Sequence, residues 1–417
     1  MTTASLSAFG ARQAILPVVL ACLLLAGCTA QQRQLPPDNG RDNAPDATSS
    51  TQPDTQPARP QTLEEMLQQD DFDLPRALLL FSAKYYGEFA SEPYTPEIEP
   101  KLARFEAYTQ DLRKELRRDK SPRMRLRTLA NFVHVKLGLR FDQNDTGGTN
   151  PENLFFDRVL TRRFGYCVTL SMAYIVFGQA AGLDVRGVRI PGHFAVIYTD
   201  TENDGTPFKT LVETTAYGAM RDELQYWSEH RFHVNAVEAG VYLTPLTDKG
   251  IFSTLYNNLG GVSFLADKFE LALERYGRAI ELAPNNAEAL YNRAVVLRNR
   301  KRYSEALRDV NSALRLDPNF TLALLVRAAL FWEEGEKDSA RADLATAMKQ
   351  RPEWPEPHML DGGFLMRDRR LDDARKAFER VLELNPAYKS AHIALAELEQ
   401  AAGNPLKAKK HMAAAQD

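Results

Sequence analysis

Hydrophobic and polar residues follow two different periods in the first part of the chain. Apolar residues first recur at helical spacing in three segments: 75–89, 98–116 and 123–139. Three short runs further on are rich in Val, Ile, Phe, Tyr and Thr, which is typical of strands: 185–190, 193–199 and 208–214. The last two runs flank the turn-forming residues 200–207, so we expect them to pair as an antiparallel hairpin. The pattern predicts an α+β domain over residues 62–250, with helices first and then a sheet.

From Ser253 onward the sequence repeats every 34 residues. One column of the repeat holds Ala272, Ala306, Ala340, Ala374 and Ala408, and another holds Pro284, Pro318, Pro352 and Pro386. Small residues let two helices approach closely, and proline ends the second helix of each unit. This pattern resembles the tetratricopeptide repeat (TPR), which implies an all-α solenoid. The predicted repeats are 253–286, 287–320, 321–354, 355–388 and 389–417.

Two columns of the repeat correspond to positions that face the groove in TPR proteins that bind peptides. They contain Tyr291, Leu325, Trp332, Met359 and Met366. A groove lined by these side chains is largely apolar, which favours a peptide or helix held by apolar anchors. The same residues fit equally well an interface with the other domain of the protein itself. Both interpretations of the five residues stay open at this point.

The first residues have the pattern of a signal peptide. Arg12 precedes an apolar stretch, residues 14–25, that is shorter than the ~20 residues needed to span a bilayer. The string LLAGC, residues 24–28, resembles the bacterial lipobox, which implies cleavage after residue 27 and a lipid on Cys28. Thr29 after that cysteine implies the outer membrane, facing the periplasm. Residues 28–61 are rich in Pro, Asp, Gln and Ser, so we expect a disordered tether.

Composition narrows the candidate chemistry. The formal net charge is −3, and no dense run of Lys or Arg suggests nucleic-acid binding. Of the three cysteines, Cys22 would be removed with the signal peptide and Cys28 would carry lipid. Only Cys167 would remain in the mature chain, where it has no second thiol for an internal disulfide. In an oxidising compartment such a thiol is expected to be either buried or used.

Cys167 stands where a thiolate is favoured. Gly165 opens a turn, and Cys167 begins a predicted helix that runs to about residue 181. The positive end of a helix dipole stabilises a thiolate and lowers the pKa of the thiol. His193 begins the first strand of the hairpin and is the candidate base, while Glu213, late in the second strand, is the candidate partner of the imidazole. Asp200 is the reserve for that third position, because the hairpin register is not given by the sequence.

The order Cys helix, His strand, acid strand resembles the transglutaminase-like branch of papain-type folds. The string FFDRVLTRRFGYC followed by GLDVRGVRIPGHFAV is similar to the SirB-type transglutaminase-like family, over about residues 74–217. The resemblance implies a catalytic triad of Cys167, His193 and Glu213, although Asp is more usual than Glu at the third position. The backbone N–H of Cys167 would stabilise an oxyanion together with a second donor. Asn153 is the first candidate for that donor, with Asn150 and Gln143 as alternatives.

Two functions from different classes follow from these features. The first is an envelope lipoprotein whose cysteine domain transfers acyl groups or hydrolyses amides, as a transglutaminase-like acyl transferase or a peptidase, while the TPR groove holds a protein. The alternative is a non-catalytic TPR adaptor with a relic Cys-His domain. We expect no cofactor and no metal, since His134, His230 and His233 lack the spacing of metal ligands. The sequence does not distinguish hydrolysis from transamidation.

Overall fold

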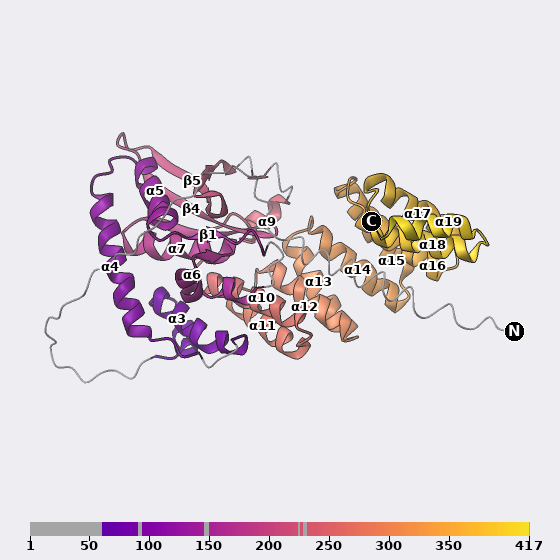
Figure 1. The fold of residues 1–417 in the computed structure, drawn as a ribbon, viewed down its shortest axis with the longest axis horizontal. Coiled ribbons are helices and arrows are strands. Elements are labelled where there is room, and N and C mark those ends of the chain that lie inside the picture. The colour runs from indigo at the N-terminus through magenta and orange to yellow at the C-terminus, as the bar shows by residue number, and fades with distance from the viewer. Residues whose placement is uncertain (1–60, 91–93, 146–149, 224–225, 228–231, 417) are drawn as a thin grey trace.

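A computed structural model describes residues 61–90, 94–145, 150–223, 226–227 and 232–416 (Figure 1). The predicted signal peptide, Cys28 and nearly all of the predicted tether lie outside the described residues, as does His230. No helix in the described ranges combines the length and the apolar character required to cross a membrane.

The described part of the chain begins with a series of helices. They are α2 (Leu63–Gln68), α3 (Leu74–Tyr85), η1 (Tyr86–Glu88), α4 (Ile98–Leu116), α5 (Pro122–Asn131) and the π-helical turn η2 (Phe132–Lys136). The side chains of Thr62, Asp73 and Ser121 cap α2, α3 and α5, as polar N-cap residues do. The predicted helix over 123–139 ends early, because Gly138 adopts φ +68° and turns the chain into strand β1 (Arg140–Phe141).

The predicted strands form one antiparallel sheet beside a buried helix. The sheet has the order β3 (Asp184–Ile190), β4 (His193–Thr201), β5 (Pro207–Glu213), β6 (Ala219–Arg221). Helix α7 (Cys167–Ala180) packs on it, and its residues 168–178 are all buried. The elements before α7 are η3 (Pro151–Leu154), α6 (Phe156–Arg162) and β2 (Phe164–Gly165), which pairs with β1. The prediction of helices first and then a sheet is confirmed.

Ten helices follow the sheet and make five consecutive pairs in the described part of the chain. After η4 (Thr214–Ala216) and α9 (Val234–Glu238) come α10 (Asp248–Leu265), α11 (Phe269–Leu282), α12 (Ala287–Asn299), α13 (Tyr303–Leu316), α14 (Thr321–Glu334), α15 (Lys337–Gln350), α16 (Glu356–Arg367), α17 (Leu371–Leu384), α18 (Lys389–Ala401) and α19 (Pro405–Ala414). A Cβ at Gly260 would lie 2.6 Å from Tyr276, and one at Gly362 would lie 2.4 Å from Phe378. The same close helix approach thus recurs in register with the 34-residue repeat, which confirms the predicted all-α TPR solenoid.

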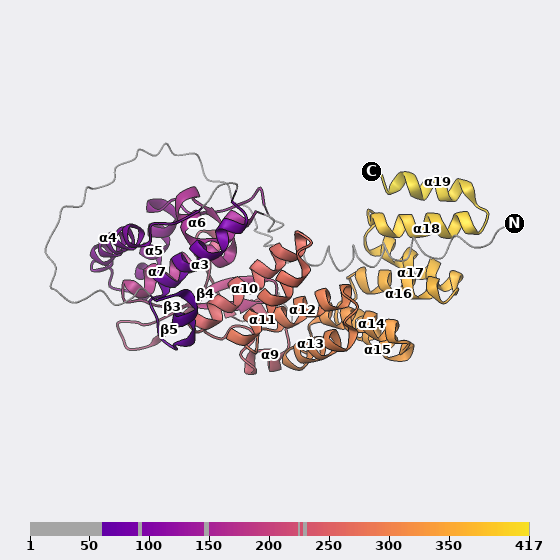
Figure 2. The same ribbon diagram turned by 90° about the horizontal axis from the view of Figure 1, so that it is seen from below.

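The solenoid and the α+β domain share hydrophobic cores. The Phe252 ring on α10 lies 5.9 Å from the rings of both Phe72 and Phe81, and the hydroxyls of Tyr256 and Tyr85 lie 3.0 Å apart. The opposite face of the sheet contributes Val188 and other strand residues to a second core, which continues into α12 and α14. Figures 1 and 2 show α10 to α13 beside the α+β domain and α14 to α19 extending away from it. The first two repeats are therefore packed as part of the first domain.

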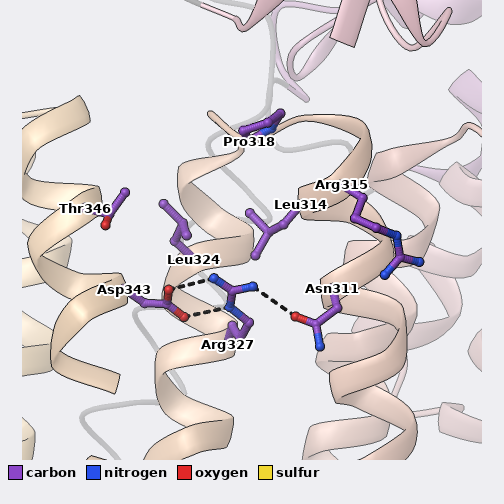
Figure 3. Close-up of a pocket in the computed structure, with 8 residues that line it drawn as sticks. All are labelled: Asn311, Leu314, Arg315, Pro318, Leu324, Arg327, Asp343 and Thr346. Atoms are coloured by element: carbon purple, nitrogen blue, oxygen red, sulfur yellow. Dashed lines mark hydrogen bonds and ion pairs between the residues drawn. The ribbon is translucent and has the colours of Figure 1, made fainter. Parts of the chain in front are cut away.

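An Arg–Asp ion pair repeats along the solenoid. Arg293 makes two bonds of 2.7 and 2.8 Å to Asp309, and Arg327 makes two bonds of 2.8 Å to Asp343. Figure 3 shows the second pair on a pocket wall, where Arg327 also donates to Asn311. Both pairs join the first helix of a repeat to the second at the same spacing, so each fixes how the two helices pack.

Candidate active site

The turn before α7 presents Cys167 at the first helical position. The backbone N–H of Tyr166 donates to the Thr169 hydroxyl at 3.0 Å, and that hydroxyl donates to the Asn153 carbonyl at 2.7 Å. A Cβ at Gly165 would lie 2.7 Å from the same hydroxyl, so only glycine fits the turn without displacing its neighbours. Thr169 therefore joins the helix start to the preceding loop. Cys167 itself is partly exposed and forms no disulfide among the described residues.

His193 and Glu213 meet across strands β4 and β5. Val196 pairs with Val212, and this register brings the end of β5 beside the start of β4. The Nε2 atom of His193 lies 2.8 Å from Oε2 of Glu213, and the two side chains are 11% and 12% exposed. His193 also shares a hydrogen bond with the side chain of Cys167. The three residues predicted as catalytic are thus brought together by the fold.

Glu213 accepts several further hydrogen bonds that hold it in place. The Tyr226 hydroxyl donates to Oε2 at 2.6 Å, and Thr215 donates to Oε1 through its hydroxyl at 2.6 Å and its backbone N–H at 3.2 Å. Tyr226 is a site residue that the sequence analysis missed. It lies beyond the sheet, in a segment with no repeat or motif that would indicate contact with the acid.

The electrostatics of the pair favour an imidazolium. Burial lowers the pKa of His193, but the hydrogen bonds and charges of Cys167 and Glu213 outweigh it and raise that pKa to about 10. Burial raises the pKa of Glu213, but His193, Thr215 and Tyr226 bring it down to about 2. Glu213 therefore stabilises the fold above its ordinary pKa of 4.5, an effect lost as the pH falls through 2. His193 stabilises it below 6.5, an effect lost as the pH rises through 10.

Hydroxyl groups connect the helix start to the end of β5. The Thr214 hydroxyl lies 2.9 Å from the Ser171 hydroxyl and 3.5 Å from the carbonyl oxygen of Cys167. Ser171 and Thr214 are fully buried, each with 0% exposure. This contact fixes the first turn of α7 relative to the residue that follows Glu213, so the nucleophile and the acid are held in one rigid unit.

Two of the reserve candidates have other partners. Asp200 makes an ion pair with Arg125 at 2.6 Å, at the far end of β4 from His193, so it is not the acid of the site. Asn153 has no exposed surface, and its amide donates to Asp142 at 2.8 Å and accepts from Arg162 at 3.1 Å. The expectation that Asn153 supplies the second oxyanion donor is therefore wrong. Its contacts support the loop instead.

Asn150 and Gln143, the alternative candidates for the second oxyanion donor, have no contact that supports this role either. The Asn150 side chain accepts from the backbone N–H of Glu152 at 3.1 Å and caps η3. Gln143 is exposed. The backbone N–H of Cys167, at the first position of α7, remains the candidate donor that the geometry supports.

The predicted groove residues lie inside the solenoid. Tyr291, Leu325 and Met359 are each 3% exposed, Trp332 is 5% exposed, and Met366 packs on the third hydrophobic core. The Trp332 ring stacks on Phe364 at 4.2 Å between centroids. Neighbouring helices therefore cover most of the surface of the first four side chains, while Met366 is only partly buried. That these five residues contact a partner stays a prediction. Tyr291, Leu325 and Trp332 belong to the same hydrophobic core as Val188 and Ile190 of the sheet.

Within the described ranges, no three or more His, Cys, Asp or Glu side chains lie together in a group that could hold a metal ion. His134 is buried, and its Nδ1 lies 2.8 Å from the Leu139 carbonyl oxygen. His233 caps α9 through a bond from the Asn235 N–H. Both histidines thus have structural contacts.

A Cys-His-acid site at the start of a buried helix, followed by a helical repeat, defines the class of this chain. The family model described as the transglutaminase-like superfamily matches residues 99–257, and the tetratricopeptide repeat model matches residues 266–319 and 365–417. The chain therefore carries a transglutaminase-like domain followed by TPR repeats.

Related proteins match more than half of the chain, at low identity. A UPF0162 protein of Xylella fastidiosa strain Temecula1 is 24% identical over 254 residues, which cover 58% of this chain and 83% of that protein. A second UPF0162 protein, from strain 9a5c, is 23% identical over 236 residues, covering 54% of this chain and 78% of that protein.

Solved structures with similarity to the chain match about two fifths of its length. MamA from Desulfovibrio magneticus RS-1 is 21% identical, with a TM-score of 0.33, and the match covers 39% of this chain and 93% of MamA. PilF from Pseudomonas aeruginosa is 21% identical, with a TM-score of 0.36, and the match covers 40% of this chain and 77% of PilF.

Proposed function

We propose that the chain is a cysteine acyl-transfer enzyme in which Cys167 is the nucleophile, His193 the base and Glu213 the residue that orients the imidazole. The observation that carries this proposal is the contact of 2.8 Å between His193 Nε2 and Glu213 Oε2, with the imidazole also bonded to Cys167 at the start of α7. A relic site would not need an acid held by three further donors. The SirB-type pattern around Cys167 and His193 supports the same proposal.

The geometry supports a two-step reaction. The Cys167 thiolate attacks an amide carbonyl carbon, and the carbon–nitrogen bond breaks as His193 gives its proton to the leaving amine. The product is a thioester on Cys167. Water or a second amine then attacks the thioester carbon and loses a proton to His193, which releases the acyl group and restores the thiolate. Glu213 keeps its charge throughout and stabilises the imidazolium.

The TPR block supports a role in holding a protein. Repeats of this type generally bind proteins or peptides, so we propose a protein substrate or partner for the solenoid. Since Tyr291, Leu325, Met359 and Trp332 are almost entirely buried, we expect more exposed side chains of the solenoid to make most of that contact.

Labelling by a substrate-like electrophile tests the catalytic proposal. At neutral pH, the native protein is expected to bind a glutamine-containing peptidyl chloromethyl ketone on Cys167 faster than the protein denatured in guanidinium, as peptide mapping by mass spectrometry would show. Cys167→Ser is the control that takes up no label. If native and denatured protein react at equal rates, the site is not activated and the non-catalytic adaptor is the better description.

We also propose that the protein is an envelope lipoprotein anchored through Cys28. The lipobox at residues 24–28 and the polar stretch after it support this. In cells fed radiolabelled palmitate, Cys28→Ala is expected to abolish the label and move the protein from the membrane to the soluble fraction. Cys22→Ala is the matched control, because that residue would leave with the signal peptide, and it should keep both label and location. Loss of the label in both variants would contradict the assignment of Cys28.

A further inference from the structure

The second repeat of the solenoid contacts the turn that carries the catalytic histidine. Oε1 of Glu288, in the first turn of α12, accepts a hydrogen bond of 2.9 Å from the backbone N–H of Gly192. Gly192 directly precedes His193 and has φ +67°, so it forms the tight turn between β3 and β4. A carboxylate from the TPR block is thus bonded to the backbone one residue away from the imidazole.

The start of α12 is itself fixed from two sides. Asn285 accepts from Arg189 of β3 at 3.0 Å and donates to the carbonyl oxygen of Gly240 at 2.8 Å. Asn286, which caps α12, donates to the buried Ser253 hydroxyl of α10 at 2.9 Å. The position of Glu288 is therefore determined by the sheet and by the first repeat together. A side chain held in this way can fix the backbone that it binds.

The charges around Glu288 connect it to the catalytic pair. Burial raises the pKa of Glu288, the Gly192 N–H and Arg189 lower it, and the charge of Cys167 raises it. Arg189 is only 3% exposed, and its Nε and Nη1 atoms are buried with no hydrogen-bond partner among the described residues. Burial lowers the pKa of Arg189 and the charge of Glu288 opposes this, so the guanidinium and the carboxylate that accepts the Gly192 N–H interact in one polar group adjoining the site.

We propose that Glu288 is a positioning residue of the active site, which holds the Pro191–Gly192 turn so that the imidazole of His193 faces the thiol of Cys167. This inference rests on the proposed cysteine chemistry, and it assigns to the TPR block a part in that chemistry besides partner binding. Glu288 acts through the backbone of Gly192 and not on the reacting atoms. An acceptor oxygen at this place is required, whereas a negative charge is not.

Replacement of the acceptor tests the proposal. Glu288→Met keeps the length of the side chain but removes the strong acceptor, while Glu288→Gln keeps an amide oxygen that can accept from Gly192. The measurement is the alkylation rate of Cys167 by iodoacetamide as a function of pH, with the thermal unfolding midpoint as the check on folding. We expect Glu288→Met to slow alkylation at pH 6 about tenfold and to shift the pH profile toward that of an ordinary thiol, since a small misplacement of a catalytic group is costly. Glu288→Gln should keep the wild-type profile.

The outcomes separate this inference from the proposed function. The control is Glu305→Met, which removes an exposed carboxylate of the next helix and should change neither rate nor profile. If Glu288→Met reacts like the wild type while His193→Ala does not, the positioning role is wrong and the cysteine chemistry stands. If Glu288→Gln is as slow as Glu288→Met, the hydrogen bond to Gly192 is not the cause and the proposal is overturned. If the wild-type protein itself reacts like an ordinary thiol, the proposed function fails, and this inference fails with it.

Discussion

The His193→Ala variant is expected to alkylate Cys167 about 300-fold more slowly than the wild type at pH 6. An ordinary thiol with a pKa of about 8.5 is only about 0.3% thiolate at that pH, whereas a thiol paired with an imidazolium is almost fully ionised. The structure supports the pair, because contacts with Cys167 and Glu213 raise the pKa of His193 to about 10. Stopped-flow measurement of iodoacetamide incorporation checks this expectation. The pH should run from about 5 to about 10, so that it covers the range in which an ordinary thiol titrates.

The shape of the two pH profiles is the sharper part of this prediction. In the wild type, the rate should be nearly level from pH 6 to 9, because the imidazolium persists until the pH approaches 10. In His193→Ala the rate should rise through the ordinary thiol range and meet the wild type only in alkali. Glu213→Gln should fall between the two, since it removes the negative charge that stabilises the imidazolium. A wild-type profile that already rises with the pKa of an ordinary thiol would contradict the ion pair.

Removal of the solenoid is expected to abolish folding of the transglutaminase-like domain. A chain cut after residue 247 lacks α10, and it would expose Phe72 and Phe81, whose rings lie 5.9 Å from the ring of Phe252. Loss of a buried Phe from a core costs roughly 3–5 kcal/mol, and this cut removes several such contacts against a typical stability of about 5–15 kcal/mol. The truncated protein should show no cooperative thermal transition by circular dichroism and should accumulate as aggregate.

The matched control is a cut after Gln350, at the end of α15. It removes α16 to α19 but leaves the first two repeats that pack on the sheet and on α3. This variant exposes the Trp332 ring, which stacks on Phe364, so a lower unfolding midpoint is expected, with the transition still cooperative. Cys167 of this variant should react with iodoacetamide as fast as it does in the full-length protein. A stable, soluble domain from the chain cut after residue 247 would show that α10 to α12 are dispensable.

The sequence predicted the elements of the site but not all of their contacts. Cys167 and His193 could be placed because each begins a regular element, a helix and a strand. Glu213 was the first candidate for the acid and Asp200 the reserve, but the sequence could not fix the register of β4 and β5, which depends on the pairing of Val196 with Val212 in the folded sheet. Tyr226 lies in no periodic segment, so nothing in the chain indicates that its hydroxyl reaches Glu213.

For the solenoid, the sequence pattern predicts the helices but not which of their side chains are buried. The 34-residue period gives the helices and their close approach, because the alanine and proline columns are direct consequences of packing. The same period does not tell which apolar column faces a neighbouring helix and which faces solvent, and Tyr291 and Leu325, expected in the groove, are each only 3% exposed. Glu288 could not be found from the pattern either, because it lies 75 positions after Glu213 along the chain and reaches the site only through tertiary packing.

The contact between Tyr85 and Tyr256 joins residues 171 positions apart, and it closes the core on which α7 rests. The core beside α7 would therefore remain incomplete until the first solenoid helices have also been made, because contacts of such long range form late. Until then, the thiol of Cys167 would not be held beside His193 and would react as an ordinary thiol. The order of the two domains along the chain would thus delay the appearance of a reactive nucleophile until the first repeats have packed on the sheet.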